Sequence, residues 1–241
     1  MKVILKIRRY NPETDSEPND QTFEVEAEPT DRLLDLLMAI KSEQDSTLGF
    51  RKSCAHGVCG SDAMRINGKD RLACKTLVRD VAEADGATVT IAPLRHFPVL
   101  RDLIVDQTDF FSKYRAISPF LINPEPPPEK ERRQSPEERK TFDDPTNCIL
   151  CLACFSACPV LDVNARFIGP AVIAQAFRFN EDSRDKGFTE RLPVLAEPDG
   201  VPACKNYFEC TRCCPRGIKI TKRINQTRKR ISDYKEGNEG Y

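Results

Sequence analysis

Two short stretches near the start of the chain place apolar residues at every second position. Val3, Leu5 and Ile7 alternate with Lys6 and Arg8, and apolar and polar residues alternate again in residues 23–27. A period of two is typical of a strand with one buried face. The pattern therefore predicts two strands that pair with each other.

The next stretch, "PTDRLLDLLMAIKSEQ" at residues 29–44, changes to the period of a helix. Its leucines recur on one side, and the Pro-Thr-Asp before them is a helix start signal. Residues 63–74 follow with a hairpin signal at Asn67-Gly68, and residues 88–94 have the pattern of a last strand. This order predicts an α+β arrangement in which a helix lies on a mixed sheet.

The character of the chain changes after about residue 105. Residues 123–140 contain five prolines and dense charge, so they cannot bury a face and indicate a surface connection. Beyond them, "GPAVIAQAFRFNEDSRD" and "ITKRINQTRKRISDYK" have helical patterns. We therefore predict an α+β protein, with a first domain at residues 1–105 and an all-α domain at residues 106–241.

Charge and hydropathy exclude several classes of partner. The 37 Lys and Arg residues balance the 37 Asp and Glu residues, so no net field favours nucleic acid or an anionic surface. No apolar run approaches the roughly 18 residues that cross a bilayer, and the N-terminus shows no secretory signal. We expect a soluble or peripheral protein of the cytoplasm. Its eleven cysteines are then expected to bind metal rather than to form disulfides.

The first set of candidate metal ligands lies in "CAHGVCGSDAMRINGKDRLAC". Cys54-x4-Cys59-x2-Asp62, followed by the distant Cys74, has the spacing of a plant-type 2Fe-2S site with Asp62 in place of the third cysteine. A carboxylate can also bind iron. We predict these four residues as ligands, with water or Ser61 as the alternative to Asp62.

Glycines and histidines near these ligands bear on the type of metal site. Gly57 and Gly60 allow a tight loop that points amide N–H groups at cluster sulfurs. Zinc is an alternative, but Cys74 has no nearby mate of the kind that structural zinc uses. A Rieske centre needs two histidines, whereas only His56 lies nearby and His96 is distant in sequence. We therefore expect His56 to be a loop residue.

A second set of cysteines occurs in two matching runs. "CILCLACFSACP" at residues 148–159 has the Cys-x2-Cys-x2-Cys-x3-Cys-Pro spacing of two-cluster ferredoxins, in which the fourth cysteine binds the other cluster. The reciprocal run, "CKNYFECTRCCP" at residues 204–215, has Tyr207 in place of its second cysteine. Without that ligand, the second cluster is predicted to keep three irons. Cys213 fits no ligand position and is interpreted as a spare buried thiol. The crossover assigns Cys148, Cys151, Cys154 and Cys214 to a 4Fe-4S cluster, and Cys158, Cys204 and Cys210 to a 3Fe-4S cluster.

Over nearly the whole chain, the order of "SCAHGVCGSDAMRING", "CILCLAC", "FIGPA" and "CPRGI" resembles the iron-sulfur subunit of succinate dehydrogenase or quinol:fumarate reductase. The resemblance implies a β-grasp 2Fe-2S ferredoxin domain followed by an all-α two-cluster ferredoxin-like domain. It implies that electrons pass singly from a flavoprotein subunit with FAD, where succinate is oxidised, through the three clusters to membrane quinone. It also implies one or two membrane-anchor subunits and a peripheral place on the cytoplasmic side of the cell membrane. Fumarate reduction is the alternative direction.

One region departs from many ubiquinone-using members of that family. They have a tryptophan shortly after the first Cys-Pro and a histidine after the first cysteine of the second run. Here those places hold Asp162, Val163 and Lys205. The quinone is therefore either ubiquinone or menaquinone. By position alone, Pro159, Lys205 and Tyr207 are candidates for the quinone site.

Three other functions fit part of the sequence. Iron-sulfur subunits of other flavin dehydrogenases or of heterodisulfide-type reductases often have two complete cysteine runs, and Tyr207 and the 2Fe-2S loop argue against them. A zinc-dependent interaction module is a second alternative. A basic cluster near the C-terminus suits nucleic acid, but the neutral net charge favours a solvated helix face or contact with acidic lipid or a partner. That cluster consists of Lys219, Lys222, Arg223, Arg228, Lys229 and Arg230.

Overall fold

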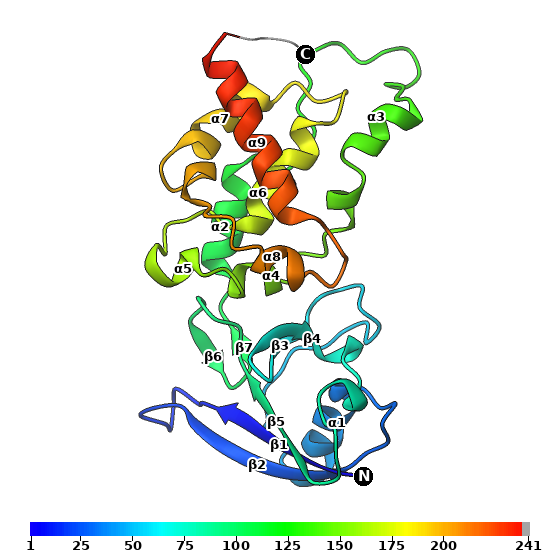
Figure 1. Ribbon diagram of the computed structural model, residues 1–241, viewed down its shortest axis with the longest axis vertical. Helices are drawn as coiled ribbons and strands as arrows, with labels where there is room; N and C mark the ends of the chain where they lie inside the picture. Colours follow the sequence, from blue (N-terminus) through cyan, green and yellow to red (C-terminus); the bar gives the residue numbers. More distant parts are fainter. Residues whose placement is uncertain (238–241) are drawn as a thin grey trace. The chain divides into compact units, whose positions relative to one another are not determined.

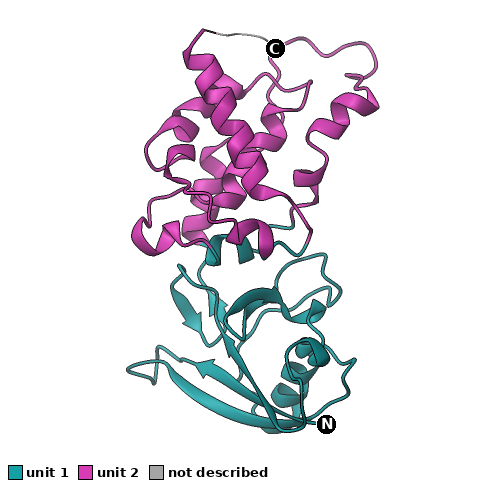
Figure 2. Cartoon of the chain, viewed as in Figure 1, with its two compact units in different colours: residues 1–107, 149–157, 213–215 teal, residues 108–148, 158–212, 216–241 magenta. Residues whose placement is uncertain are grey.

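The structure is a computed structural model that describes residues 1–237. The chain forms two compact units, and each unit contains segments from distant parts of the sequence (Figure 2). Unit 1 consists of residues 1–107, 149–157 and 213–215, and the described part of unit 2 of residues 108–148, 158–212 and 216–237.

Unit 1 is built on a five-stranded sheet (Figure 1). Val3 pairs with Val25, and Leu5 pairs with Phe23, in an antiparallel register that buries all four side chains. The predicted pairing of the first two strands is confirmed. The first strand also runs parallel to the last, so the sheet is mixed. The order across the sheet is β2 (Asn19–Glu26), β1 (Lys2–Arg9), β5 (Ala87–Ala92), β3 (Ala63–Ile66) and β4 (Lys69–Leu72).

The predicted hairpin at Asn67-Gly68 is also confirmed. Both residues have positive φ, 47° and 75°, as a two-residue hairpin turn with the twist of its strands requires. The smaller elements of this unit are a π-helical turn at Ile40–Gln44, 3-10 turns at Ala73–Lys75 and Val78–Asp80, and the hairpin of β6 (Val99–Arg101) and β7 (Ile104–Val105).

Helix α1 (Leu33–Ala39) begins later than the sequence pattern predicts. The prediction placed its start at residues 29–31, but Arg32 is still extended, with φ −94° and ψ 146°. The N–H group of Val78 donates to the carbonyl of Asp31 at 2.9 Å, and Arg32 forms a β-bridge with Leu77. Because the backbone at residues 31 and 32 pairs with this neighbouring segment, it does not join the helix.

Helix α4 (Ala153–Ser156) belongs to unit 1, although it lies in the second half of the sequence. The ring of Phe155 lies 5.1 Å from that of Phe97, and the hydroxyl of Ser156 donates to the carboxylate of Asp70. The sequence prediction divided the chain once, near residue 105, and so placed this segment in the second domain. Contacts between residues so far apart in sequence leave no periodic pattern of apolar residues, so the prediction did not include them.

In the part that the structure describes, unit 2 consists of helices and turns. Its central helix is α6 (Pro170–Asn180), in which ten of the eleven residues are buried. The amphipathic helix α9 (Ile220–Lys235) packs against it and buries Ile224 and Ile231. Both predicted helices are confirmed. The other elements are α2 (Thr108–Ala116), α3 (Pro136–Thr141), α5 (Val160–Val163), α7 (Phe188–Ala196) and α8 (Glu209–Arg212), with 3-10 turns at Asp144–Asn147 and Val201–Ala203.

The proline-rich connection is mostly exposed, as predicted, yet it contains helix α3. The hydroxyl of Ser135 accepts the N–H of Glu138 at 3.2 Å, and the Glu138 carboxylate accepts the N–H of Ser135 at 2.7 Å. This reciprocal pair is a capping box. Its signal, Ser-Pro-Glu-Glu, lies within a stretch that its prolines and charges marked as irregular.

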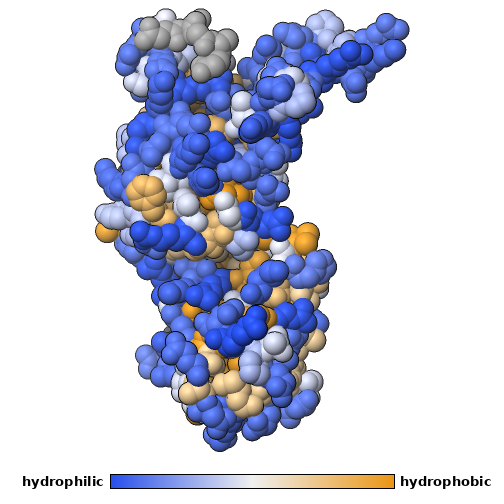
Figure 3. All heavy atoms as spheres, turned by 45° about the vertical axis from the view of Figure 1, so that its right-hand side comes forward, coloured by the Kyte–Doolittle hydropathy of each residue, from blue (hydrophilic) through white to orange (hydrophobic). Residues whose placement is uncertain are grey.

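The surface is largely polar. Hydrophilic side chains cover most of the face shown in Figure 3. Of the predicted basic cluster, Lys222 and Lys229 are exposed, whereas Arg223 pairs with Asp144. No helix within residues 1–237 is both long enough and apolar enough to cross a membrane.

Candidate iron-sulfur sites

The loop that begins at Cys54 surrounds the sulfur of this residue with backbone donors. The N–H groups of His56, Cys59 and Val58 donate to Cys54 Sγ at 3.5, 3.3 and 3.3 Å. These donors stabilise the thiolate and lower the pKa of Cys54 to about 6. The thiolate is the form that binds metal, so the loop prepares this sulfur for iron.

Asp62 and Cys74 lie side by side in the interior next to this loop. Asp62 is 2% exposed, and its Oδ2 accepts the backbone N–H of Cys74 at 2.5 Å. Its other oxygen, Oδ1, is buried and has no hydrogen-bond partner within residues 1–237. Burial, and then the Asp62 carboxylate, raise the pKa of the Cys74 thiol to about 12. A buried oxygen without a partner is costly, and a metal ion at this place would satisfy it.

Two further candidates lie at the same loop. Ser61 Oγ is 3.1 Å from Cys59 Sγ, so the alternative oxygen donor is also present. His56 is exposed, and its Nδ1 contacts the carbonyl of Cys54 in its own loop. Unit 1 thus brings together the four residues whose spacing predicts a 2Fe-2S site. They are Cys54, Cys59, Asp62 and Cys74.

Gly60 allows this loop to pack against the first cysteine run. Its φ is +71°, and a Cβ built on it would lie 2.6 Å from the Cβ of Cys151 and 3.0 Å from its Cα. Real side chains do not approach so closely, and only glycine adopts this φ without strain. Any side chain at residue 60 would push the loop away from Cys151.

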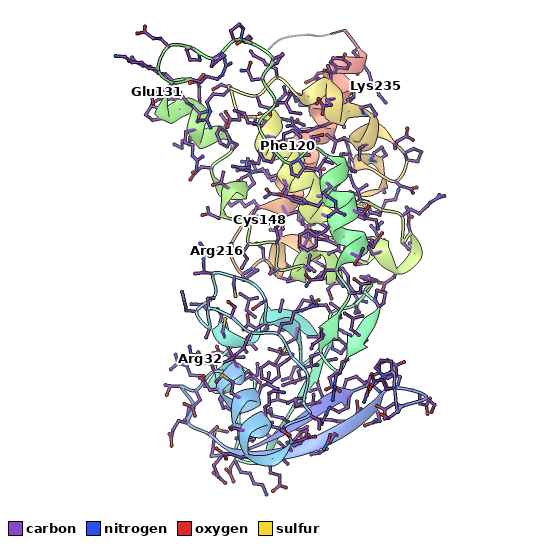
Figure 4. The ribbon with its side chains drawn as sticks, turned by 180° about the vertical axis from the view of Figure 1, so that it is seen from behind. Arg32, Phe120, Glu131, Cys148, Arg216 and Lys235 are labelled. Atoms are coloured by element: carbon purple, nitrogen blue, oxygen red, sulfur yellow. The ribbon has the colours of Figure 1, made fainter. Side chains whose placement is uncertain are left out.

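The predicted 4Fe-4S ligands are divided between the two compact units. Cys151, Cys154 and Cys214 belong to unit 1, whereas Cys148, labelled in Figure 4, ends a segment of unit 2. Cys154 lies on α4 and is 7% exposed. Within residues 1–237, none of the eleven cysteines forms a disulfide.

The two cysteine runs begin with the same local structure. A 3-10 turn precedes each, and the N–H of Cys148 donates to Pro145 as the N–H of Cys204 donates to Val201, both at 3.2 Å. The dihedral angles of the two cysteines agree within one degree, at φ −64° and ψ 127° against φ −65° and ψ 126°. In both runs a short helix, α4 or α8, begins five residues after this cysteine.

The same agreement extends to strained positions. φ is positive two and four residues after the first cysteine of each run, at Leu150 (50°) and Leu152 (67°) and at Asn206 (59°) and Phe208 (66°). For residues other than glycine this conformation is unfavourable by about 1–2 kcal/mol each. The second run therefore keeps the whole backbone frame, although Tyr207 stands where the first run has a cysteine.

A cavity in unit 2 is lined by the thiols of Cys158, Cys204 and Cys210. Cys158 and Cys210 are each 7% exposed. Burial raises the pKa of Cys158 to about 11, the neighbouring Cys210 and Cys204 add to this effect, and burial also raises the pKa of Cys210. Neighbouring thiols raise each other's pKa because their thiolates repel. Positive metal ions bound among them remove this repulsion, so all of them can ionise. The predicted 3Fe-4S ligands thus share one cavity.

The three residues predicted for a quinone site line this cavity as well. Pro159, Lys205 and Tyr207 all contribute to its wall. The Tyr207 side chain is 54% exposed, so it reaches from the cavity wall to the solvent. Sequence reasoning had placed them together only by their positions in the two runs.

Thr221 is a site residue that sequence reasoning missed. Its Oγ1 lies 3.4 Å from Cys210 Sγ and 3.0 Å from the hydroxyl of Thr211. It is 2% exposed and belongs to α9 rather than to a cysteine run. No ligand spacing points to it, because its place depends on how α9 packs.

Comparisons with known proteins identify iron-sulfur domains in both halves of the chain. Residues 4–112 match the family model of a 2Fe-2S iron-sulfur cluster binding domain, and residues 144–218 match that of a 4Fe-4S dicluster domain. The succinate dehydrogenase iron-sulfur subunit of Coxiella burnetii is 42% identical over 98% of this chain and 100% of its own length. The fumarate reductase iron-sulfur subunit of Mycobacterium tuberculosis is 42% identical over 90% of this chain and 87% of its own.

This chain belongs to the family of succinate dehydrogenase and fumarate reductase iron-sulfur subunits. A chain of the solved Mycobacterium smegmatis Sdh1 complex in the apo form has the same fold, with a TM-score of 0.88 and 28% identity, over 98% of this chain and 97% of that one. The resemblance and the α+β fold class are confirmed. Like other iron-sulfur subunits of this family, the chain has a 2Fe-2S and a 4Fe-4S cluster-binding domain.

The thiol sets of this iron-sulfur subunit fit the way in which a cluster is held. Within residues 1–237, no group of three or more His, Cys, Asp or Glu side chains is arranged to hold one metal ion. Thiolates around a cluster bind different irons, with inorganic sulfide between them, so they need not converge on one point. The thiol sets described above, together with the unsatisfied Asp62 oxygen, fit such groups.

Proposed function

We propose that this chain is the electron-transfer subunit of a succinate:quinone oxidoreductase. Its curated relatives are iron-sulfur subunits of succinate dehydrogenase and of fumarate reductase. The observation that carries the proposal is the pair of cysteine runs with one backbone frame, of which the second has Tyr207 at a ligand position. A chain that keeps this frame and omits one ligand is suited to a 3Fe-4S cluster next to a 4Fe-4S cluster.

The proposed role of the chain is to hold three clusters and to set their properties. When bound, these clusters accept and release single electrons, which divides the two-electron oxidation of succinate into steps suited to a quinone. The backbone donors at Cys54 and the hydroxyl at Cys210 stabilise negative charge on ligand sulfurs. The proposed ligands are Cys54, Cys59, Asp62 and Cys74 for 2Fe-2S, Cys148, Cys151, Cys154 and Cys214 for 4Fe-4S, and Cys158, Cys204 and Cys210 for 3Fe-4S.

The chemistry of the dicarboxylate is assigned to a partner. In this proposal a flavoprotein subunit with FAD oxidises succinate and delivers electrons to the 2Fe-2S site. One or two membrane-anchor subunits hold the chain at the cytoplasmic side of the cell membrane. Ubiquinone or menaquinone then accepts electrons near Pro159, Lys205 and Tyr207, which line the three-thiol cavity.

Metal analysis and electron paramagnetic resonance of the anaerobically purified complex test the cluster assignment. We expect about nine irons per chain, the sum of the three cluster types, and an oxidised 3Fe-4S signal. About eight irons without a 3Fe signal would indicate two 4Fe-4S clusters and no 2Fe-2S cluster, contrary to the assignment. Zinc in place of iron would refute it.

Variants of Asp62 test the unusual ligand. Asp62→Ala should make the 2Fe-2S centre labile or shift its spectrum while the other two clusters persist, because one ligand of one site is lost. Asp62→Cys should preserve the centre, since it restores the common thiolate set. An unchanged 2Fe-2S resonance and potential in Asp62→Ala would show that Asp62 is not a ligand.

Fumarate reduction is the second candidate function. The identity to a fumarate reductase subunit, 42%, equals the identity to a succinate dehydrogenase subunit. Succinate oxidation and fumarate reduction, measured on the same purified complex with the quinone that co-purifies with it, separate the two. A faster fumarate reduction would reverse the proposed direction.

A further inference from the structure

Arg32 connects three parts of unit 1 that build the 2Fe-2S site. Its side chain donates from Nη1 to the carbonyl of Ala55 at 2.8 Å, and Ala55 follows the predicted ligand Cys54. Its backbone forms a β-bridge with Leu77, three residues after the predicted ligand Cys74. Arg32 itself directly precedes helix α1 (Figure 4). One residue thus ties both ligand-bearing segments to the start of a helix.

A carboxylate fixes the direction of the Arg32 guanidinium. Nε and Nη2 donate to the two oxygens of Asp35 at 2.8 and 2.9 Å, in a bidentate arrangement. The backbone N–H of Arg32 also donates to Asp35 Oδ2 at 3.1 Å. Asp35 and Ala55 hold two edges of the guanidinium. Its positive charge is therefore fixed beside the loop that begins at Cys54.

This charge acts on the predicted ligands. Nη1 reaches the carbonyl of Ala55, the residue after the predicted ligand Cys54, at 2.8 Å. Opposite charges attract at short range, so the guanidinium favours negative charge at the 2Fe-2S site. Reduction adds one negative charge to a cluster, and a nearby fixed positive charge makes that step more favourable. The charge of Asp35 has the opposite effect.

We propose that Arg32 is a positioning residue of the 2Fe-2S site and raises the reduction potential of its cluster, against the opposing charge of Asp35. The inference rests on the proposed function, because it requires a 2Fe-2S cluster at Cys54, Cys59, Asp62 and Cys74. Arg32 touches no reacting atom. It acts through the loop that it holds and through its charge.

The test is a redox titration of the intact purified complex, followed by the electron paramagnetic resonance of the reduced 2Fe-2S cluster. Arg32→Gln removes the charge and should lower the ratio of reduced to oxidised cluster about threefold at a fixed ambient potential. For a one-electron couple this equals about 28 mV, at 59 mV per tenfold change. The effect is modest because the side chains of the pair are 40% and 39% exposed and solvent screens them.

Two further variants separate charge from packing. Arg32→Lys keeps the positive charge but not the bidentate contact with Asp35. Its 2Fe-2S reduction potential should therefore lie closer to the wild-type value than that of Arg32→Gln. Asp35→Asn removes the opposing charge and should shift the potential upward. Opposite signs for Arg32→Gln and Asp35→Asn are not expected of residues that only hold the fold.

Each outcome decides between the inference and the proposed function. A wild-type complex without a 2Fe-2S signal refutes the proposed function. A normal signal with an unmoved potential in Arg32→Gln, or with shifts of the same sign in Arg32→Gln and Asp35→Asn, overturns the inference alone. If Arg32→Gln assembles no cluster, Asp35→Asn decides: an unchanged or lowered potential overturns the proposal, and a raised potential supports it.

Discussion

The two cysteine runs have one backbone frame but different surroundings. In the first run α4 packs against Phe97 and Asp70 of unit 1, whereas in the second run Cys210 on α8 meets Thr221 of α9 in unit 2. The frame is therefore a property of the runs themselves, since two unlike environments leave it unchanged. What differs is the side chain at the second ligand position and the neighbours of the sulfurs. We infer that the first difference sets the number of irons and the second adjusts the potential.

Burial also differs at equivalent positions of the frame. Leu152 is 1% exposed, whereas its counterpart Phe208 is 50% exposed. Both have positive φ, so both are strained. In the first run buried apolar surface offsets the strain, while in the second run that contribution is smaller.

Removal of the ligand that distinguishes the first run is expected to have the largest effect. Cys151→Ala gives the first run the same three-thiolate set as the second, so its cluster should lose one iron or fail to assemble. Quinone-linked turnover should fall at least about tenfold, a loss usual even for indirect partners of a metal. Cys213→Ser is the matched control, because it removes a thiol outside the predicted sets. Equal losses in both variants would contradict the assignment.

The reverse change is Tyr207→Cys, which supplies a thiolate to the second run. We expect the 3Fe-4S centre to become 4Fe-4S, with one more iron per chain and a lower reduction potential, because added negative charge disfavours reduction. Quinone-linked turnover should fall more than dye-linked succinate oxidation. Electron paramagnetic resonance and both assays check this, with Tyr207→Phe as the control that should keep three irons. A persistent 3Fe signal would mean that the shape of the site excludes the fourth iron.

The difference in burial can be tested with glycine at the strained positions. Leu152→Gly should lower the free energy of unfolding by about 2 kcal/mol or more, since the lost apolar contacts outweigh the relieved strain. Phe208→Gly should change it by no more than about 1 kcal/mol and in the stabilising direction. Denaturant unfolding of the purified complex measures both. A larger loss for Phe208→Gly would show that the frames are supported alike.

The smallest expected effect concerns the neighbours of the sulfurs. Thr221→Val removes the hydroxyl beside Cys210 and should lower the potential of the second cluster by roughly 20 to 65 mV, the equivalent of one hydrogen bond. The first cluster should not move. Thr221→Ser keeps the hydroxyl and serves as the control. A shift shared by both clusters would assign the effect to a general change in packing.

Sequence reasoning succeeded where the determining residues lie close together along the chain. The paired strands and the Asn67-Gly68 hairpin depend on local periodicity and turn chemistry, and the structure confirms both. The ligand assignments, which depend on spacings along the chain, stay predictions. It failed where contacts join distant segments. The late start of α1, the inclusion of α4 in unit 1 and the contact of Thr221 with Cys210 all depend on such contacts. The spacing suggested Asp62 as a ligand, but only the structure shows its unsatisfied oxygen.

The division of unit 1 among three segments has a consequence for synthesis on the ribosome. Its first segment is complete at residue 107, but Phe155 and Ser156, which pack against it, emerge about fifty residues later, and residues 213–215 later still. N-terminal domains usually fold first during translation. Here the unit that is begun first is among the last to be finished, so its early segment lacks these contacts until the later segments have been made. A ribosome that stops before residue 155 would release a nascent chain whose N-terminal unit lacks the buried side chains of Phe155 and Ser156.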